Sequence, residues 1–169
     1  MSGLIEFTAL AREAAAAIER REQQYPALID AGKISAEQAA REIRVWRSIA
    51  ADWHWVVTLE RQDAAAATLE EKVAALEDST RRAERALRRA FEAADRSVRE
   101  AWRRDMPLTE IADRYGETAA PFLGEWDRYW RFADLLEWYR RDLPGSDRFG
   151  IAHFVERHIQ GARQVQAAA

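Results

Sequence analysis

Hydrophobic residues recur every three or four positions along most of the chain, which is the spacing of helices that bury one face. The first such stripe comprises Leu4, Phe7, Leu10, Ala11, Ala14 and Ile18. It predicts a helix over residues 4–24. Pro26 then predicts a bend or a break, because a proline inside a helix removes one backbone hydrogen bond and clashes with the preceding turn. Gly32 is expected to end this segment as a left-handed cap.

A second helical region is predicted to begin after Ser35, since Gln38 follows three residues later and forms a capping box. Residues 33–106 contain neither glycine nor proline. One stripe in this stretch comprises Ala36, Ala39, Ile43, Trp46, Ala50, Trp53 and Val57. Another comprises Ala66, Leu69, Val73, Leu76, Thr80, Ala83 and Leu87, and continues as Phe91, Ala94, Val98 and Trp102.

These two stripes are out of phase, so either one long helix rotates its apolar face near Gln62 or two helices meet there. The run at 78–80, Asp-Ser-Thr, offers another break. We favour one helix over residues 35–77 and a second over residues 79–104. The 3–4 spacing of both stripes is the heptad spacing of coiled coils.

The remainder of the chain predicts three shorter helices. Residues 108–115 form a helix ended by Gly116, and Pro121 begins another that continues to Pro144-Gly145. The last helix begins after Ser146 or Asp147. The predicted fold is therefore all-α, with a long helical hairpin or coiled-coil arm over residues 1–104. This arm packs with a C-terminal three-helix bundle over residues 105–169; one continuous domain is the alternative.

Composition excludes several classes of chemistry. The chain has no cysteine, so it carries no disulfide, thiolate zinc site or iron–sulfur cluster. Its N-terminus lacks the pattern of a secretory signal, and its apolar runs are too short to cross a bilayer. These features predict a cytoplasmic protein without a membrane partner.

No motif for catalysis or for binding a cofactor is recognisable. His153 and His158 are five residues apart, which places them on different sides of a helix, and His54 lacks the preceding glutamate of carboxylate-bridged metal bundles. The glycines are scattered singly, without a Gly-x-Ser-x-Gly or phosphate-binding cluster. We therefore predict no metal, no cofactor and no enzymatic activity.

Residues 107–125 carry the best local motif, the pattern of a helix-turn-helix. Ala112 would pack against the second helix, Gly116 would make the turn, and Phe122 would be buried. Pro121 inside the second helix and the acidic surroundings argue against DNA binding. A short connector helix is the favoured interpretation, and a DNA-binding regulator remains an alternative.

Charge is concentrated in one segment. Residues 81–104 hold nine basic and four acidic side chains, although the whole chain has a net charge of −3. Four arginines share one side of the predicted helix: Arg81, Arg85, Arg88 and Arg89. We favour a solvated face paired with Glu77, Glu84 and Glu92. The alternative is a patch that attracts an acidic protein partner.

Aromatic residues between positions 126 and 139 cover nearly the whole circumference of their helix. A helix that is apolar all round is either central in a bundle or shared with a partner. Because tryptophan and tyrosine dominate binding hot spots, we predict a partner-binding surface. Its anchors would be Trp126, Tyr129, Trp130 and Trp138. Packing within the core is the alternative.

Residues 19–53 carry a recognisable order of features. An arginine-rich helix leads to Tyr25-Pro26, then to Gly32-Lys33-Ile34, and then to a helix that contains Ile43 and Ile49 and ends in Asp52-Trp53. This segment resembles small uncharacterised helical proteins of proteobacterial phages and prophages. The resemblance implies a phage setting, in which small helical proteins often inhibit or redirect a host complex.

The sequence as a whole predicts a non-catalytic protein–protein interaction protein, in the role of a phage-encoded inhibitor or modulator of a host or defence complex. Its partner would be a protein, and an acidic one if the arginines take part. A DNA-binding regulator is one alternative. A self-assembling structural coiled-coil subunit, with a homodimer as its simplest form, is another.

Overall fold

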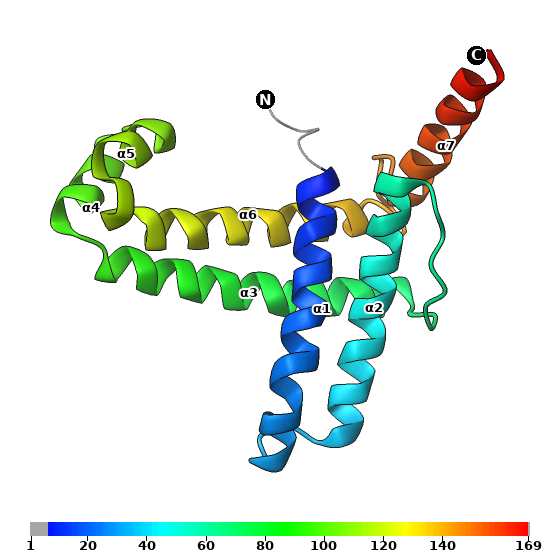
Figure 1. Ribbon diagram of the computed structural model, residues 1–169, viewed down its shortest axis with the longest axis horizontal. Helices are drawn as coiled ribbons and strands as arrows, with labels where there is room; N and C mark the ends of the chain where they lie inside the picture. Colours follow the sequence, from blue (N-terminus) through cyan, green and yellow to red (C-terminus); the bar gives the residue numbers. More distant parts are fainter. Residues whose placement is uncertain (1–6, 169) are drawn as a thin grey trace. The chain divides into compact units, whose positions relative to one another are not determined.

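The computed structural model describes residues 7–168, and within them the protein is all-α. These residues form seven α-helices and one short 3-10 helix, with no strand. The helices are α1 (Phe7–Asp30), α2 (Ala36–Thr58), α3 (Leu69–Ala93), α4 (Arg96–Arg103), α5 (Leu108–Tyr115), η1 (Gly116–Thr118), α6 (Ala120–Arg140) and α7 (Ile151–Ala168) (Figure 1). The predicted all-α class is confirmed. The helix start predicted near Leu4 lies outside the described residues.

The chain divides into two compact units. Unit 1 comprises Met1–Glu77 and Asp134–Ala169, and unit 2 comprises Asp78–Ala133. Both boundaries fall inside helices, α3 and α6, and neither coincides with the separation predicted at residue 104. Of the helices predicted to form a C-terminal bundle, α5 belongs to unit 2, α7 to unit 1, and α6 contributes to both.

Helices α1 and α2 form an antiparallel hairpin in unit 1 (Figure 1). Helix α1 runs through Pro26 to Asp30, so the possible break at Pro26 is not found. The helix ends where Gly32 was expected to end it, at a φ of +67°. The Lys33 amide donates to the Leu28 carbonyl at 2.9 Å, which is the six-residue bond of a Schellman cap. Tyr25, which precedes Pro26, is buried, and its hydroxyl donates to Glu42 of α2.

Helix α2 begins as predicted, with the Ser35 hydroxyl accepting from the Gln38 amide at 3.0 Å. Its buried face is only partly the predicted stripe. Ala39, Trp46, Ile49, Trp53 and Val56 are buried. The predicted Ile43, Ala50 and Val57 lie at the edge of this face or outside it. The buried Trp46, Ile49, Trp53 and Val56 also follow a 3–4 spacing, so the buried face lies on the other side of Trp46 and Trp53 from the predicted one. Drift of an ideal helix from a heptad is too small to cause this, at about 20° per heptad.

Small residues of α1 cover this face. Ala14 and Ala17 are fully buried, which lets the two helix backbones approach each other around the large indoles of α2. The guanidinium of Arg21 lies 4.2 Å from the Trp46 ring centroid. The Phe7 and Trp53 rings lie 5.9 Å apart at the other end of the hairpin. The first predicted stripe, in its described part from Phe7 to Ile18, therefore lies on the face of α1 that meets α2.

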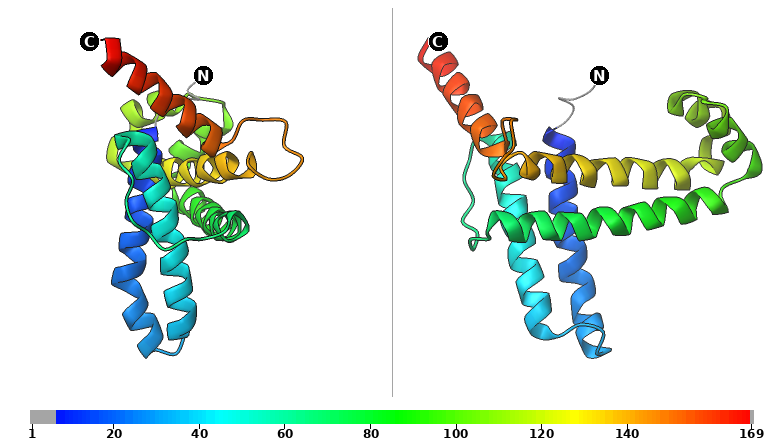
Figure 2. Two further views of the ribbon diagram at one scale, coloured as in Figure 1. Left: turned by 90° about the vertical axis from the view of Figure 1, so that its right-hand side faces the viewer. Right: turned by 180° about the vertical axis from the view of Figure 1, so that it is seen from behind.

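The structure corrects the helix predicted over residues 35–77. Helix α2 ends at Thr58, and residues 59–68 form a loop that returns along α2 (Figure 2). Leu59 ends α2 in a left-handed conformation with a φ of 61°. The run of four alanines at 64–67 lies in this loop although alanine has the highest helix propensity. Helix propensity is a small term that tertiary contacts override.

A capping box starts α3 after the loop. The Glu71 amide donates to the Thr68 hydroxyl at 3.1 Å, and the Glu71 carboxylate accepts from the Thr68 amide at 2.9 Å. Arg44 of α2 forms a two-pronged ion pair with Glu71 and donates to the Ala66 carbonyl at 2.6 Å. The pair of Thr68 and Glu71 was visible in the sequence and is the signal that would have located this helix start.

Unit 2 has its own apolar core. Val98 and Ala101 of α4, Ile111 of α5, Ala119 and Phe122 are buried together. Helix α3 ends at Ala93 and α4 begins at Arg96, so the single helix predicted over residues 79–104 is interrupted. Asp95 is the cause, because its carboxylate accepts from the Ser97 amide at 2.8 Å and caps α4.

We expect Thr68→Ala to lower the free energy of unfolding by about 1 kcal/mol, because the Glu71 amide loses its acceptor at the start of α3. Urea denaturation measures this loss, and hydrogen exchange of the amides at 69–73 should accelerate. The control is Thr109→Ala, since the exposed Thr109 side chain makes no hydrogen bond within the described residues. Unchanged exchange at 69–73 would contradict the capping role.

Candidate functional site

A row of aromatic rings leads from the core of unit 2 to its surface. We call this the aromatic row, and its members are Phe91, Trp102, Phe122, Trp126, Tyr129 and Trp130. The Trp102 and Trp126 rings are 4.7 Å apart, the Trp126 and Trp130 rings 5.9 Å, and the Tyr129 and Trp130 rings 5.3 Å. All three contacts are edge-on or tilted, the arrangement that aromatic pairs prefer.

From Phe122 outward, burial falls along the row. Phe122 is 2% exposed, Trp126 and Tyr129 are half-buried, and Trp130 is 45% exposed. Trp126 and Trp130 are one turn apart on α6, so the inner indole supports the outer one from the side. Contacts with Trp126 and Tyr129 on two sides limit the positions open to the exposed ring.

The arginines predicted to share a face of α3 are all exposed. Arg88 pairs with Glu84 at 2.6 Å, as predicted, and Arg81 lies 3.9 Å from Asp78. Arg85 and Arg89 form no ion pair with any residue that the structure describes. The predicted partner Glu77 instead pairs with Arg140 at 2.9 Å. Part of this face is therefore neutralised locally, and two guanidinium groups are left to the solvent.

Trp138 does not join the other predicted anchors. It belongs to unit 1, where its ring meets Phe7 at 5.7 Å and lies under the Arg141 guanidinium at 4.2 Å. The sequence placed four aromatic residues on one surface because they lie on one helix. The structure brings Trp126, Tyr129 and Trp130 together in unit 2 and uses Trp138 in the packing of unit 1.

The helix-turn-helix interpretation fails at its packing residue. Ala112 is exposed, whereas Ile111 beside it is fully buried. Helix α5 therefore turns a different face to its neighbours from the one that the motif requires. Phe122 is buried as expected, and Arg114 pairs with Glu110 at 3.1 Å on the surface of α5. The connector-helix interpretation fits these positions.

A polar cluster that the sequence analysis missed lies in unit 1. The Lys72 ammonium approaches Asp52 Oδ2 at 2.6 Å, and the Tyr139 hydroxyl donates to the same oxygen at 2.7 Å. The ammonium also lies 5.6 Å from the centre of the Tyr139 ring. Asp52 comes from α2, Lys72 from α3 and Tyr139 from α6, so the three residues are far apart in sequence.

Burial controls the ionisation of Tyr139. Its side chain is almost entirely removed from solvent, and this raises the pKa of the phenol well above its ordinary value. The negative charge of Asp52 raises the pKa further, as does the hydrogen bond that the phenol donates. Tyr139 is therefore a protonated donor throughout the physiological range. A weak sequence signal existed, because Lys72 is one of only two lysines among 26 basic residues.

Two further properties concern the described residues alone. No group of three or more histidine, aspartate or glutamate side chains converges there as metal ligands. None of the helices within residues 7–168 combines the length and the apolar character that a membrane span requires.

Comparison with protein-family models, with curated proteins and with solved structures gives no match. The arrangement of the side chains is then the basis for assigning a function. Two arrangements qualify: the exposed end of the aromatic row with the arginines of unit 2, and the polar cluster of unit 1.

Raising the pH above about 10 should destabilise the protein, because an unfolded tyrosine releases its proton there while the folded Tyr139 retains it. The stability contributed by this group is complete below that pH and is lost above it. Tyr139→Phe should weaken the alkaline loss and cost about 1–2 kcal/mol at neutral pH, since the hydrogen bond to Asp52 disappears. Urea denaturation at pH 7 and at alkaline pH measures both effects.

Part of the loss of stability at alkaline pH should remain in Tyr139→Phe, because burial and the hydrogen bond to Glu42 raise the pKa of Tyr25 to about 12. Tyr115→Phe is the matched control, since the Tyr115 hydroxyl makes no hydrogen bond within the described residues. An alkaline loss equal in the wild type and in Tyr139→Phe would refute the assignment.

Proposed function

We propose that this chain is a non-catalytic protein-binding protein whose contact surface is the exposed end of the aromatic row. The observation that carries the proposal is Trp130, 45% exposed at the end of a row of rings rooted in the core of unit 2. Exposed tryptophans are costly to leave in water, and they dominate the binding energy of protein interfaces. Trp126 and Tyr129 complete the anchor.

The proposed partner presents an acidic surface. Arg85 and Arg89 belong to the same unit and remain unpaired among the described residues, so their charge is available to attract carboxylates. Such charges act mainly on the rate of association and lose their effect in salt. The aromatic anchor then determines how long the complex lasts.

We place this role in a phage setting, as a modulator or inhibitor of a host complex. Its basis is the resemblance of residues 19–53 to small helical phage proteins. Self-assembly receives less support, because Trp46 and Trp53 of the α2 stripe are buried within unit 1 and leave no apolar seam there. A homodimer that forms through the exposed end of the aromatic row is an outcome of the experiment below.

Trp130→Ala should weaken partner binding by about 2 kcal/mol or more, as truncation of a hot-spot tryptophan does. The free energy of unfolding should change by less than about 1 kcal/mol, because the ring is largely exposed. Partners are isolated from host-cell extract on the immobilised wild type and then purified, and the dissociation constant of each is measured by calorimetry. Phe149→Ala is the matched control, since Phe149 is an exposed aromatic residue of unit 1.

Charge reversal tests the arginines separately. Arg85→Glu with Arg89→Glu should slow association with the same partner, and the effect should shrink as salt is raised. Arg12→Glu with Arg163→Glu makes the same change of charge on exposed positions of unit 1 and should leave the rate nearly unchanged. The proposal is wrong if every partner binds Trp130→Ala as tightly as the wild type. Monomeric Trp130→Ala beside a dimeric wild type would show a homodimer surface instead.

A further inference from the structure

The polar cluster of unit 1 lines a pocket of about 450 Å³. Trp55, Leu69 and Ile151 provide apolar walls, from α2, α3 and α7 respectively. Asp52 and Lys72 provide charged groups, together with Asp142 and the edge of Tyr139. This size and this mixture of apolar walls with a few converging polar groups are typical of sites for small ligands.

The charges of the lining favour a cation. Two carboxylates and one ammonium line the pocket, and the guanidinium of Arg61 lies against the ring of Trp55 in the same lining. These charges balance while Arg61 is there, and a formal charge of −1 is left when Arg61 moves aside. Lys72 and Tyr139 both bind Oδ2 of Asp52. The second oxygen, Oδ1, accepts no hydrogen bond from any residue described in the structure, and the Asp52 side chain is 33% exposed. Lys72 and Tyr139 therefore hold the carboxylate in position through Oδ2, and Oδ1 can accept a hydrogen bond from a ligand.

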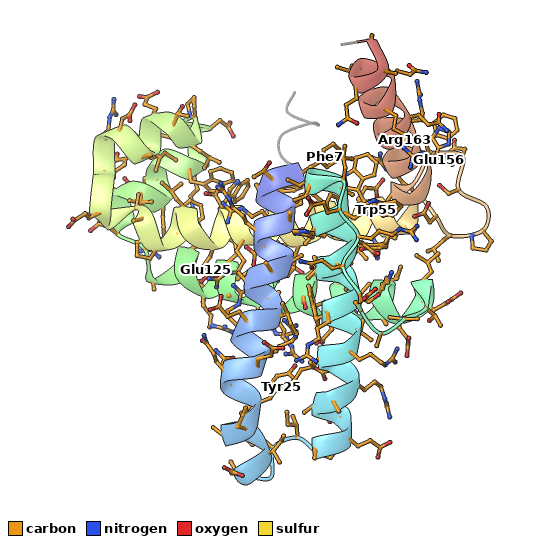
Figure 3. The ribbon with its side chains drawn as sticks, turned by 45° about the vertical axis from the view of Figure 1, so that its right-hand side comes forward. Phe7, Tyr25, Trp55, Glu125, Glu156 and Arg163 are labelled. Atoms are coloured by element: carbon orange, nitrogen blue, oxygen red, sulfur yellow. The ribbon has the colours of Figure 1, made fainter. Side chains whose placement is uncertain are left out.

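Trp55 indicates which cations the pocket suits. Its ring already carries a guanidinium, because Arg61 of the loop at 59–68 lies 4.4 Å from the ring centroid. Aromatic faces attract cations electrostatically, and planar cations also stack on them. Figure 3 shows Trp55 near the end of the α1–α2 hairpin opposite Tyr25, the end at which α7 begins.

We propose that this pocket binds a small organic cation whose amidinium, guanidinium or ammonium group pairs with Asp52 Oδ1. The apolar body of the ligand packs between Trp55, Leu69 and Ile151. Arg61 competes for the ring of Trp55 and moves aside when the ligand stacks there. The site is independent of the aromatic row, since all of its residues belong to unit 1.

Three probes of nearly equal shape test the charge of the ligand. We expect benzamidine to bind the full-length protein about tenfold more tightly than the neutral benzamide, and the anionic benzoate not to bind measurably. Calorimetry measures the affinities, and NMR of the tryptophan indole N–H groups identifies the ring that responds. A response at Trp55 alone supports the pocket.

Variants place the binding in the pocket. Asp52→Asn and Trp55→Leu should each weaken benzamidine by about tenfold, whereas Trp55→Phe should retain most of the affinity because it keeps an aromatic face. Arg61→Ala should strengthen binding, since it removes the competing guanidinium. Asp30→Asn is the control for lost charge, because Asp30 is exposed at the end of α1. Thermal denaturation shows which variants are folded. If Asp52→Asn does not fold, Trp55→Leu is the variant that tests the site.

A capped peptide that contains one arginine separates the two sources of such a cation. Tighter binding of the peptide than of benzamidine means that the pocket holds a side chain of another protein, and the reverse means that it holds a free metabolite. Either result supports the cation site. Equal binding of benzamidine, benzamide and benzoate would overturn it, as would no binding of benzamidine at millimolar concentration or full affinity in folded Trp55→Leu.

Discussion

The carboxylate of Asp52 joins three segments of unit 1 that lie far apart in the chain. It accepts the phenol of Tyr139 and the ammonium of Lys72 on one oxygen, so α2, the start of α3 and the end of α6 meet there. Tyr139 is 2% exposed, and a buried hydroxyl without a partner would cost about 1–3 kcal/mol. The requirement that this phenol be satisfied therefore limits where the end of α6 can lie within the unit.

The ion pair between Lys72 and Asp52 is incompatible with one long helix from α2 into α3, because 20 helical residues span about 30 Å. Lys72 can reach Asp52 only if the chain leaves α2 at Thr58 and returns along it, which residues 59–68 accomplish. Arg44 holds the returning segment through Ala66 and Glu71. Leaving the four alanines of this loop outside a helix costs only a few tenths of a kcal/mol to about 1 kcal/mol of helix-forming free energy per residue. The buried contacts that the reversal creates outweigh this loss.

Helix α6 is apolar on all sides because it serves two cores. Its first half contributes Phe122 to unit 2 and extends the aromatic row to Trp130. Its second half contributes Leu135 and Tyr139, both buried, to unit 1. Of the alternatives of core and interface that the sequence left open, core packing describes the buried Phe122, Leu135 and Tyr139. The interface is our proposal for the exposed end of the aromatic row. Trp130 is 45% exposed at the end of this row, and this makes it the proposed anchor for a partner.

The sequence by itself determined the all-α class, the cap at Ser35, the stop at Gly32, the short helix ended by Gly116 and the helix that begins near Pro121. These features depend on neighbouring residues, through side-chain caps and the restricted angles of glycine and proline. It also grouped Trp126, Tyr129 and Trp130 as neighbours on one helix, which the structure brings together in unit 2. Only the tertiary structure decided the loop at 59–68, the two boundaries between units, the separate position of Trp138 and the cluster of Asp52, Lys72 and Tyr139. Those depend on contacts between residues 20 to 131 positions apart. No local pattern encodes which distant group will pack on a ring or satisfy a buried phenol.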